Sequence, residues 1–201
     1  KGISGFEIAT SISPSLAKKS IFAHVNGEAW DINRAINFDC SLELKFKEDS
    51  FEVLNHSCAH LLATAVKSLY KDACFGVGPA IEEGFYYDIN PGEGVKFSDS
   101  DLLLIEKEMK KLANQDLKFE RKEVSKQEAF EIFKNDKYKT EIISELADDA
   151  VITTYTDGEY TDLCRGPHVS SAKYLKNFKL LTVSGAYWRG DSKNEQLQRI
   201  Y

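Results

Sequence analysis

Two Asx-Gly dipeptides constrain the fold of this chain more than any other feature of its sequence. Asn26-Gly27 lies inside the segment 21–32, and Asp157-Gly158 lies inside the segment 151–164, each between runs rich in apolar and β-branched residues. Such dipeptides favour the two-residue turns of β-hairpins, because both turn positions adopt positive φ. The sequence therefore predicts at least two hairpins, and with them antiparallel strand pairing.

Segments with helical periodicity separate these hairpins. One runs from about residue 50 to 70, one begins at Ser98 and one begins at Ser125. Ser98 and Ser125 are each followed three residues later by an acidic residue, which is the pattern of a capping box at a helix start. Because hairpins outnumber βαβ units, the sequence predicts an α+β fold with a mainly antiparallel sheet.

The chain is predicted to form two domains, residues 1–48 and residues 49–201. The first domain is small for an independent hydrophobic core, so we expect it to lack its first strands. Residue 1 is Lys in place of Met, which also indicates an excised fragment.

The distribution of charge bears on the class of partner. The whole chain has a formal net charge of −6, which argues against a general nucleic-acid-binding protein. Residues 161–201, in contrast, carry seven Lys and Arg against three Asp and Glu, together with Tyr174, Tyr187, Trp188 and Tyr201. This segment could meet a phosphate backbone, or it could be an ordinary solvated lysine face.

The sequence also excludes several classes of protein. No apolar run approaches the roughly 18 residues that span a bilayer, and the N-terminal residues show no signal peptide. The four cysteines lack the spacing of a disulfide framework. We therefore expect no membrane partner, reduced thiols and a cytoplasmic protein. Neither a P-loop nor a Gly-x-Ser-x-Gly motif is present.

Two pairs of metal- or proton-binding side chains stand out. His56 and His60 are four residues apart in the predicted helix 50–70, so their side chains project about 40° apart around its axis. The apolar stripe of that helix lies on the opposite side. We therefore expect this pair outside the core, where it either faces a ligand or is solvated.

The second pair, Cys164 and His168, is not helical, because Gly166-Pro167 separates its members. Cys164 is expected to end a strand in which Tyr160, Asp162 and Cys164 share one face. A face of this polarity is not expected in the core.

Two interpretations of these pairs are open. Three histidines and one cysteine supply the four nitrogen and sulfur donors of a closed zinc site. Alternatively, the same side chains line a cleft and position water and substrate without a metal.

Four segments resemble the N-terminal part of the threonyl-tRNA synthetases, and they cover essentially the whole chain in order. These segments are NHSCAHLL (55–62), GPAIEEGFYYD (78–88), YTDLCRGPHV (160–169) and GAYWRGDSKNEQLQRIY (185–201). The resemblance implies a small ubiquitin-like (β-grasp) TGS domain at 1–48, truncated at its start. It also implies an editing domain at 49–201, shared in outline with the alanyl-tRNA synthetases.

The resemblance further implies post-transfer editing, in which the ester of mischarged seryl-tRNA(Thr) is hydrolysed to serine and tRNA(Thr). No ligase activity is expected, because the aminoacylation domain, with its ATP site and its zinc, lies outside this chain. The expected partner is the acceptor end of tRNA(Thr). The full-length enzyme is expected to be a homodimer through the missing domains.

The family's site residues can be carried over by motif. The implied catalytic residues are His56, His60, Lys139, Asp162, Cys164 and His168. Tyr155, Asp162 and Lys139 are implied to bind substrate: Asp162 suits its ammonium group, and Lys139 suits the ester oxygen or a proton transfer. His56 or His60 is expected to orient water or to contact the hydroxyls of the tRNA 3′ end.

The resemblance leaves the metal open, because the alanyl relatives hold zinc with a similar set of ligands. We expect no metal in this domain, with zinc on His56, His60, Cys164 and His168 as the alternative. Two other functions are considered: a tRNA-binding or regulatory module without catalysis, and a zinc-dependent editing hydrolase of the alanyl type.

Overall fold

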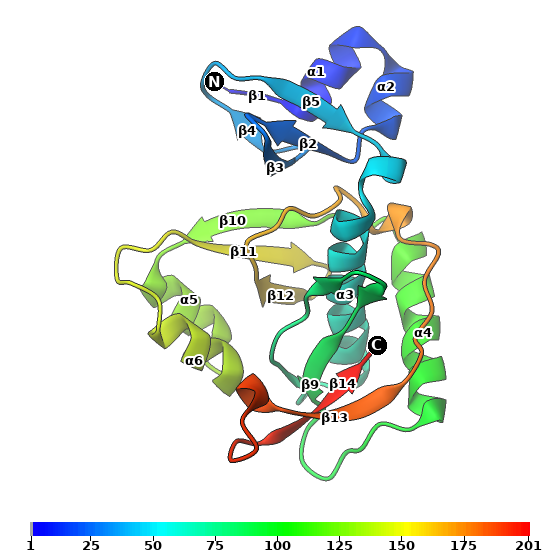
Figure 1. Ribbon diagram of the computed structural model, residues 1–201, viewed down its shortest axis with the longest axis vertical. Helices are drawn as coiled ribbons and strands as arrows, with labels where there is room; N and C mark the ends of the chain where they lie inside the picture. The colour runs from blue at the N-terminus through cyan, green and yellow to red at the C-terminus, as the bar shows by residue number, and fades with distance from the viewer. Residues whose placement is uncertain (1) are drawn as a thin grey trace.

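The computed structural model describes residues 2–201, which form two bodies, one above the other in Figure 1. We call residues 2–46 the N-terminal body and residues 47–201 the C-terminal body. Within residues 2–201, no helix combines the length and the hydrophobicity needed to cross a bilayer.

The N-terminal body is a small mixed unit with a three-stranded sheet. Its elements are β1 (Ile3–Ser4), α1 (Gly5–Ile12), α2 (Pro14–Lys19), β2 (Phe22–Val25), β3 (Glu28–Asp31), β4 (Ala35–Ile36) and β5 (Leu42–Lys45). The strand order is β3-β2-β5, and β1 pairs separately with β4. The turn between β2 and β3 has φ of 50° at Asn26 and 85° at Gly27, so the first predicted hairpin is confirmed.

Helix α1 was not predicted from the sequence. Ser4 caps it, because its Oγ accepts from the backbone N–H of Glu7 at 3.2 Å, while Glu7 Oε2 accepts from the N–H of Ser4 at 2.8 Å. This Ser-x-x-Glu pattern is a capping box, and it is the local sequence signal from which the start of α1 could have been predicted. The helix is eight residues long, too short for its periodicity to stand out.

The C-terminal body surrounds a central helix, α3. Its helical elements are η1 (Lys47–Asp49), α3 (Phe51–Leu69), α4 (Asp99–Asn114), α5 (Lys126–Phe133), α6 (Lys137–Ser144), η2 (Ala172–Tyr174) and η3 (Trp188–Gly190). Its strands are β6 (Cys74–Phe75), β7 (Ala80–Ile81), β8 (Gly84–Phe85), β9 (Tyr87–Asn90), β10 (Glu120–Val124), β11 (Ile152–Asp157), β12 (Tyr160–Leu163), β13 (Val183–Tyr187) and β14 (Gln196–Ile200).

These strands form two main sheets, in the orders β10-β11-β12 and β13-β14-β9-β6, and the short pair β7-β8. Every pair of named strands in the described chain is antiparallel. The predicted α+β class with mainly antiparallel pairing is therefore confirmed. The second predicted hairpin, β11–β12, is also confirmed, but its turn is formed by Gly158 and Glu159, because Asp157 still pairs with Tyr160 as the last residue of β11.

The prediction that both histidines of α3 lie outside the core was wrong for His60. Helix α3 packs against α4, and also against β7, β8, β11 and β12, so residues 57–66 are all buried. His60 is 2% exposed, whereas His56, one turn earlier, is half-buried. The hairpin β11–β12 covers the side of α3 that lies opposite its apolar stripe, which a helical wheel cannot show.

The polar face of β12 is also buried, contrary to the sequence-based expectation. Tyr160 is 7% exposed and belongs to the main hydrophobic core, and Asp162 is 2% exposed. The opposite face carries Leu163, which packs against a second, smaller core between β11 and the helices α5 and α6. This second core supports one wall of the candidate site.

Candidate active site

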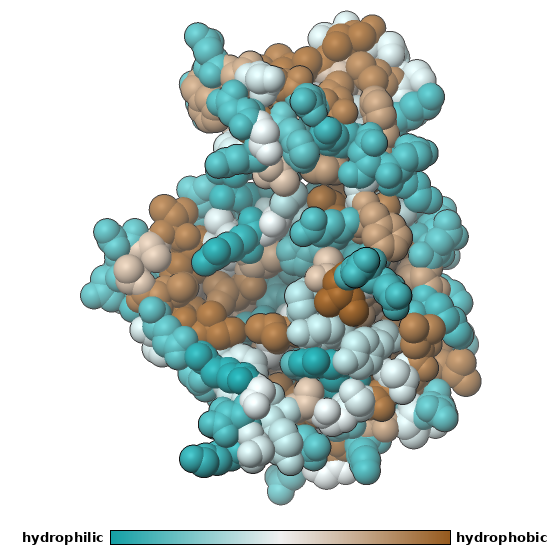
Figure 2. All heavy atoms as spheres, viewed as in Figure 1, coloured by the Kyte–Doolittle hydropathy of each residue, from teal (hydrophilic) through white to brown (hydrophobic). Residues whose placement is uncertain are grey.

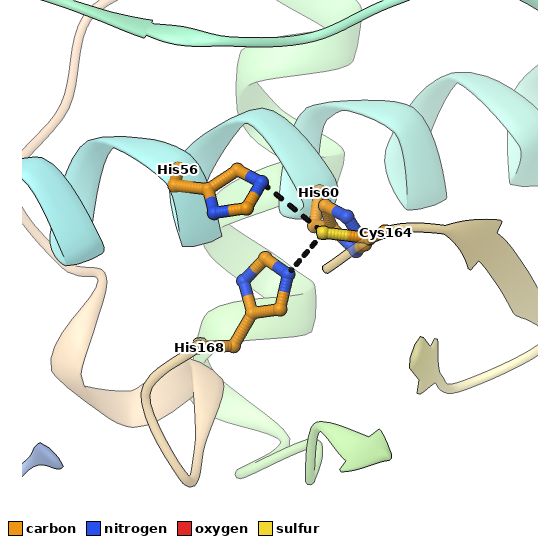
Figure 3. Close-up of side chains that lie close together, drawn as sticks. All are labelled: His56, His60, Cys164 and His168. Carbon is orange, nitrogen blue, oxygen red and sulfur yellow. Dashed lines mark hydrogen bonds between the residues drawn. The ribbon is translucent and has the colours of Figure 1, made fainter. Parts of the chain in front are cut away.

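Four metal- or proton-binding side chains meet beside α3. His56 and His60 come from α3, and Cys164 and His168 come from the segment after β12 (Figure 3). One donor atom of each lies within 4.8 Å of the donor atoms of the other three. Sγ of Cys164 lies 3.2 Å from Nε2 of His56 and 3.3 Å from Nε2 of His168. The structure thus brings together both pairs that the sequence singled out.

Hydrogen bonds fix the two members that follow β12. The backbone N–H of Cys164 donates to the carbonyl oxygen of Thr153 at 3.1 Å and extends the pairing of β11 and β12. Oγ of Ser57 accepts from the backbone N–H of Val169 at 3.1 Å and lies 3.0 Å from Nδ1 of His168. The Ser57 hydroxyl can therefore donate to Nδ1, which leaves Nε2 to carry the ring proton toward Cys164.

The buried groups of this cluster shift one another's pKa. Burial alone would lower the pKa of His60, but the thiolate of Cys164 and two buried carboxylates reverse this effect and raise the pKa to about 10. Burial opposes ionisation of Cys164, but its interactions with His168 and His60 outweigh burial and hold the pKa well below its usual range. Burial and the charge of His60 lower the pKa of His168 to about 3. The directions of these shifts favour a positive charge on His60, a thiolate at Cys164 and a neutral His168.

A second buried network adjoins the cluster at Asp162. Nζ of Lys139 lies 2.6 Å from Oδ1 of Asp162, and it donates to the carbonyl oxygen of Gly76 at 2.9 Å and to Oη of Tyr87 at 3.1 Å. The hydroxyl of Tyr87 donates to Oδ2 of Asp162, which lies 3.4 Å from Nε2 of His60. Burial would raise the pKa of Asp162, but the positive charges of Lys139 and His60 hold it below its usual value.

Members of both networks line one cavity of about 550 Å³, but His168 is not among them and lies in the wall of a separate pocket with Asp31. Its polar wall is formed by His56, His60, Tyr87, Lys139, Asp162 and Cys164. Its apolar wall is formed by Ile142, Leu146, Val151, Ile152 and Leu163. On the face seen in Figure 2, hydrophobic residues gather between the β10–β12 sheet and the helices α5 and α6. The cavity can therefore hold a molecule with one polar and one apolar end.

Tyr155, which the resemblance implied to bind substrate, is not among the residues that line this cavity. Its ring centroid lies 4.5 Å from that of His168, and its hydroxyl donates to Oδ2 of Asp31 at 2.6 Å. Asp31 is the last residue of β3, and its Oδ1 accepts from the backbone N–H of His168 at 2.9 Å. One carboxylate of the N-terminal body thus holds two residues of the C-terminal body behind the cluster.

Sequence reasoning missed three residues that hold the site together. Tyr87 could have been found from the alternation along residues 85–89, which places it on the buried face of β9. Ser57 lies three residues before His60, a spacing that puts both on one side of a helix. Asp31 gave no local signal, because its partners are more than a hundred residues further along the chain.

Gly166 is expected to tolerate no side chain. Its φ is +72°, and a Cβ there would overlap the hydroxyl oxygen of Tyr155. Gly94 has the same φ of +72° but nothing within 4 Å of its Cβ position, so Gly94→Ala isolates the backbone strain. We expect Gly166→Ala to cost about 1–3 kcal/mol more than Gly94→Ala in denaturant unfolding, because a close-packed interior must shift. Equal costs would show that the loop moves freely.

Comparisons with known proteins cover both bodies. A TGS domain profile matches residues 1–45, and a profile described as "Threonyl and Alanyl tRNA synthetase second additional domain" matches residues 152–201. Cys164 and His168 lie inside the second match, whereas His56, His60 and Lys139 precede it.

Several relatives match the chain from end to end. The threonine–tRNA ligases of Lactococcus lactis, Acholeplasma laidlawii and Porphyromonas gingivalis are 55%, 53% and 52% identical to it, over 203, 203 and 205 residues. Each alignment covers 100% of this chain and 31% of the relative, so the chain spans about a third of their length. These matches confirm the resemblance drawn from the four sequence segments: over its whole length the chain is similar to one part of the threonine–tRNA ligases.

Proposed function

We propose that this chain hydrolyses the ester of seryl-tRNA(Thr), releasing serine and tRNA(Thr). The observation that carries this proposal is one cavity in which a His/Cys cluster meets a buried Lys–Asp pair. Hydrolysis of an ester needs a placed water, a group that takes its proton and a donor that stabilises the developing oxyanion. Both networks together supply acceptors and donors for these tasks.

The shape of the cavity fits the proposed substrate. Its volume of about 550 Å³ is within the usual range of small-molecule sites. The polar wall suits the amino acid and its ester, and the apolar wall formed in part by Ile142, Leu146 and Val151 suits the terminal nucleoside.

The small difference between serine and threonine gives a reason for such a site. Serine is threonine without one methyl group, and a pocket gains only about 10–200-fold in selectivity from one methyl. An aminoacylation site that binds threonine therefore also accepts serine at an appreciable rate. A second site that accepts the smaller residue removes the error.

The family resemblance suggests the proposed roles, and the geometry is compatible with them. The carboxylate of Asp162 lines the cavity and its pKa is held below its usual value, so we assign it to the ammonium of serine. Lys139 is assigned to the ester oxygen, since its Nζ lies in the wall of the cavity beside Asp162. His56, the half-buried histidine of the cluster, is assigned to take a proton from the attacking water. The water oxygen bonds to the carbonyl carbon, the bond from this carbon to the ribose oxygen breaks, and the ribose oxygen leaves with the proton.

A zinc ion would fit the four donors. His56, His60, Cys164 and His168 supply nitrogen and sulfur donors within 4.8 Å of one another, and these are the donor types that tetrahedral zinc prefers. With four protein ligands, such an ion would hold the cluster rigid and leave no open position for water. We propose that the reaction proceeds without a metal and that the groups of the chain itself activate the water.

Metal analysis tests that part of the proposal. Protein purified without chelator is expected to contain zinc far below one equivalent and to keep its hydrolytic rate after dialysis against a strong chelator. Stoichiometric zinc that is lost together with activity would contradict the metal-free mechanism and favour an alanyl-type zinc hydrolase.

Ester hydrolysis tests the function itself. The purified chain is expected to release serine from seryl-tRNA(Thr) at least about tenfold faster than threonine from threonyl-tRNA(Thr), because one methyl group distinguishes the two esters. Alanyl-tRNA(Ala) serves as the control ester. Equal rates on the seryl and threonyl esters would contradict the proposed selectivity. Salt-dependent tRNA binding without hydrolysis would instead favour a binding or regulatory module.

The proposal also includes a partner, a compartment and an oligomeric state. We assign the acceptor end of tRNA(Thr) as the partner, the cytoplasm as the compartment and a homodimer as the state of the longer relatives. No ligase activity is proposed for residues 1–201.

A further inference from the structure

His60 lies between two carboxylates, and only one of them faces the cavity. Its Nε2 lies 3.4 Å from Oδ2 of Asp162, which lines the cavity. Its Nδ1 lies 3.9 Å from Oδ1 of Asp157, which is 0% exposed and does not line the cavity. The ring of His60 thus separates a carboxylate that substrate can reach from one that it cannot.

Nδ1 of His60 and Oδ1 of Asp157 are both buried and both without a hydrogen-bond partner. Buried polar atoms are nearly always paired, because an unpaired one has lost its contact with water without replacement. These two atoms face each other, and an approach of about 1 Å would give an ordinary N–H···O hydrogen bond. Each is therefore the natural partner of the other.

The surroundings of Asp157 leave it no other cation. Its Oδ2 accepts from Oγ1 of Thr64 at 2.6 Å, and Thr64 lies one turn after His60 on α3. Among residues 2–201, the only basic group within 4.0 Å of its carboxylate is His60. Asp157 ends β11, where the turn to β12 holds it opposite Tyr160. Helix and hairpin together place the carboxylate behind the imidazole.

We propose that Asp157 is a positioning residue of the hydrolytic site. Its Oδ1 accepts a hydrogen bond from Nδ1–H of His60, and Thr64 anchors the carboxylate through its other oxygen. The ring is then held with Nε2 toward Asp162 and the cavity. A carboxylate behind a functional histidine fixes which nitrogen is presented to the site, whether that nitrogen meets water or a metal. The expected effect of Asp157 on the rate rests on the proposed ester hydrolysis. The contact between Asp157 and His60 does not depend on it.

Three variants separate the contact from general packing. Asp157→Leu keeps a similar volume and removes the acceptor, and Asp157→Asn keeps one acceptor oxygen. Thr64→Val removes the anchor together with the contact of the Thr64 hydroxyl with the carbonyl oxygen of His60. Glu106→Gln is the control, since Glu106 is a buried carboxylate that binds the N–H of Leu180 and Lys110, away from the cavity.

The first measurement is the NMR spectrum of the imidazole nitrogens, which is tractable because the chain has four histidines. His60→Gln assigns the His60 signals. We expect the wild-type chain to carry a slowly exchanging proton on Nδ1 of His60, retained in Asp157→Asn and Glu106→Gln and lost in Asp157→Leu. A bare Nδ1 in the wild type, or an unchanged signal in Asp157→Leu, would overturn the proposal.

The second measurement is hydrolysis of seryl-tRNA(Thr). Asp157→Leu is expected to lower kcat about 10–100-fold with KM within about twofold, while Asp157→Asn recovers most of the loss. An unchanged kcat in folded Asp157→Leu would overturn the positioning role. Should that variant fail to fold, Thr64→Val decides, with the same direction of change in the Nδ1 signal and in kcat expected. If the wild-type chain hydrolyses no seryl ester, the proposed function fails, and the Nδ1 signal still decides the contact.

Discussion

Replacing Lys139 with methionine is expected to lower the free energy of unfolding by about 3–5 kcal/mol, because it leaves a buried carboxylate without its ion pair. Nζ of Lys139 lies 2.6 Å from Oδ1 of Asp162, and both side chains are almost fully buried. Tyr87 and His60 stay beside the carboxylate, which places the expected loss toward the lower end of that range. Urea unfolding at neutral pH measures it.

The double variant Lys139→Met/Asp162→Asn separates stability from chemistry. Removing both charges is expected to restore most of the lost stability, whereas hydrolysis of seryl-tRNA(Thr) is expected to stay at least about a hundredfold below the wild-type rate in both variants. Lys137→Met is the matched control: it makes the same change on the same helix, at an exposed pair with Glu195, and should cost under about 1 kcal/mol. Recovery of activity in the double variant would refute the assigned roles.

Acid is expected to destabilise the protein through His168. The pKa of this buried histidine is lowered to about 3 in the folded chain, against 6.5 for the ordinary side chain. Between these values the unfolded chain binds a proton that the folded chain does not. Stability contributed by neutral His168 is therefore complete above about pH 6.5 and falls by about 1.4 kcal/mol per pH unit as the pH is lowered toward 3.

The variant His168→Gln isolates this effect from the many carboxylates that also titrate in acid. The difference in unfolding free energy between the wild type and His168→Gln is expected to shrink by about 1.4 kcal/mol for each unit between pH 6 and pH 4. Urea unfolding at several pH values provides both curves. A difference that is independent of pH would mean that His168 takes up a proton equally well in the folded chain.

Local signals predicted the elements that depend on neighbouring residues. Asn26-Gly27 forms the predicted turn, the second turn lies one residue later than predicted, at Gly158-Glu159, and Ser98 and Ser125 cap the helices α4 and α5. The capping box at Ser4 shows that such a signal is easily missed when the helix behind it is short. In each case the information lies within a few residues of the turn or cap.

What the sequence could not predict depends on residues far apart in the chain. The spacing of four residues singled out His56 and His60. The burial of His60, however, comes from the β11–β12 hairpin about a hundred residues later, whose Asp157 lies against the His60 ring. Lys139 was named only through the family resemblance, since nothing in residues 137–144 distinguishes it from a solvated lysine. Its partner Asp162 lies on another element, and only the folded chain joins them.

The contact of Asp31 with Tyr155 and His168 has a consequence for chimaeras made between this chain and its relatives. A chimaera joined at the boundary between the N-terminal and C-terminal bodies takes Asp31 from one protein and Tyr155 and His168 from the other. The junction therefore divides one hydrogen-bonded unit. Exchanging the N-terminal body between relatives will preserve the geometry behind the His/Cys cluster only if the acceptor at position 31 is transferred with a matching donor at position 155. The smallest part that can be recombined is therefore defined by this carboxylate and its two donors, rather than by the order of helices and strands.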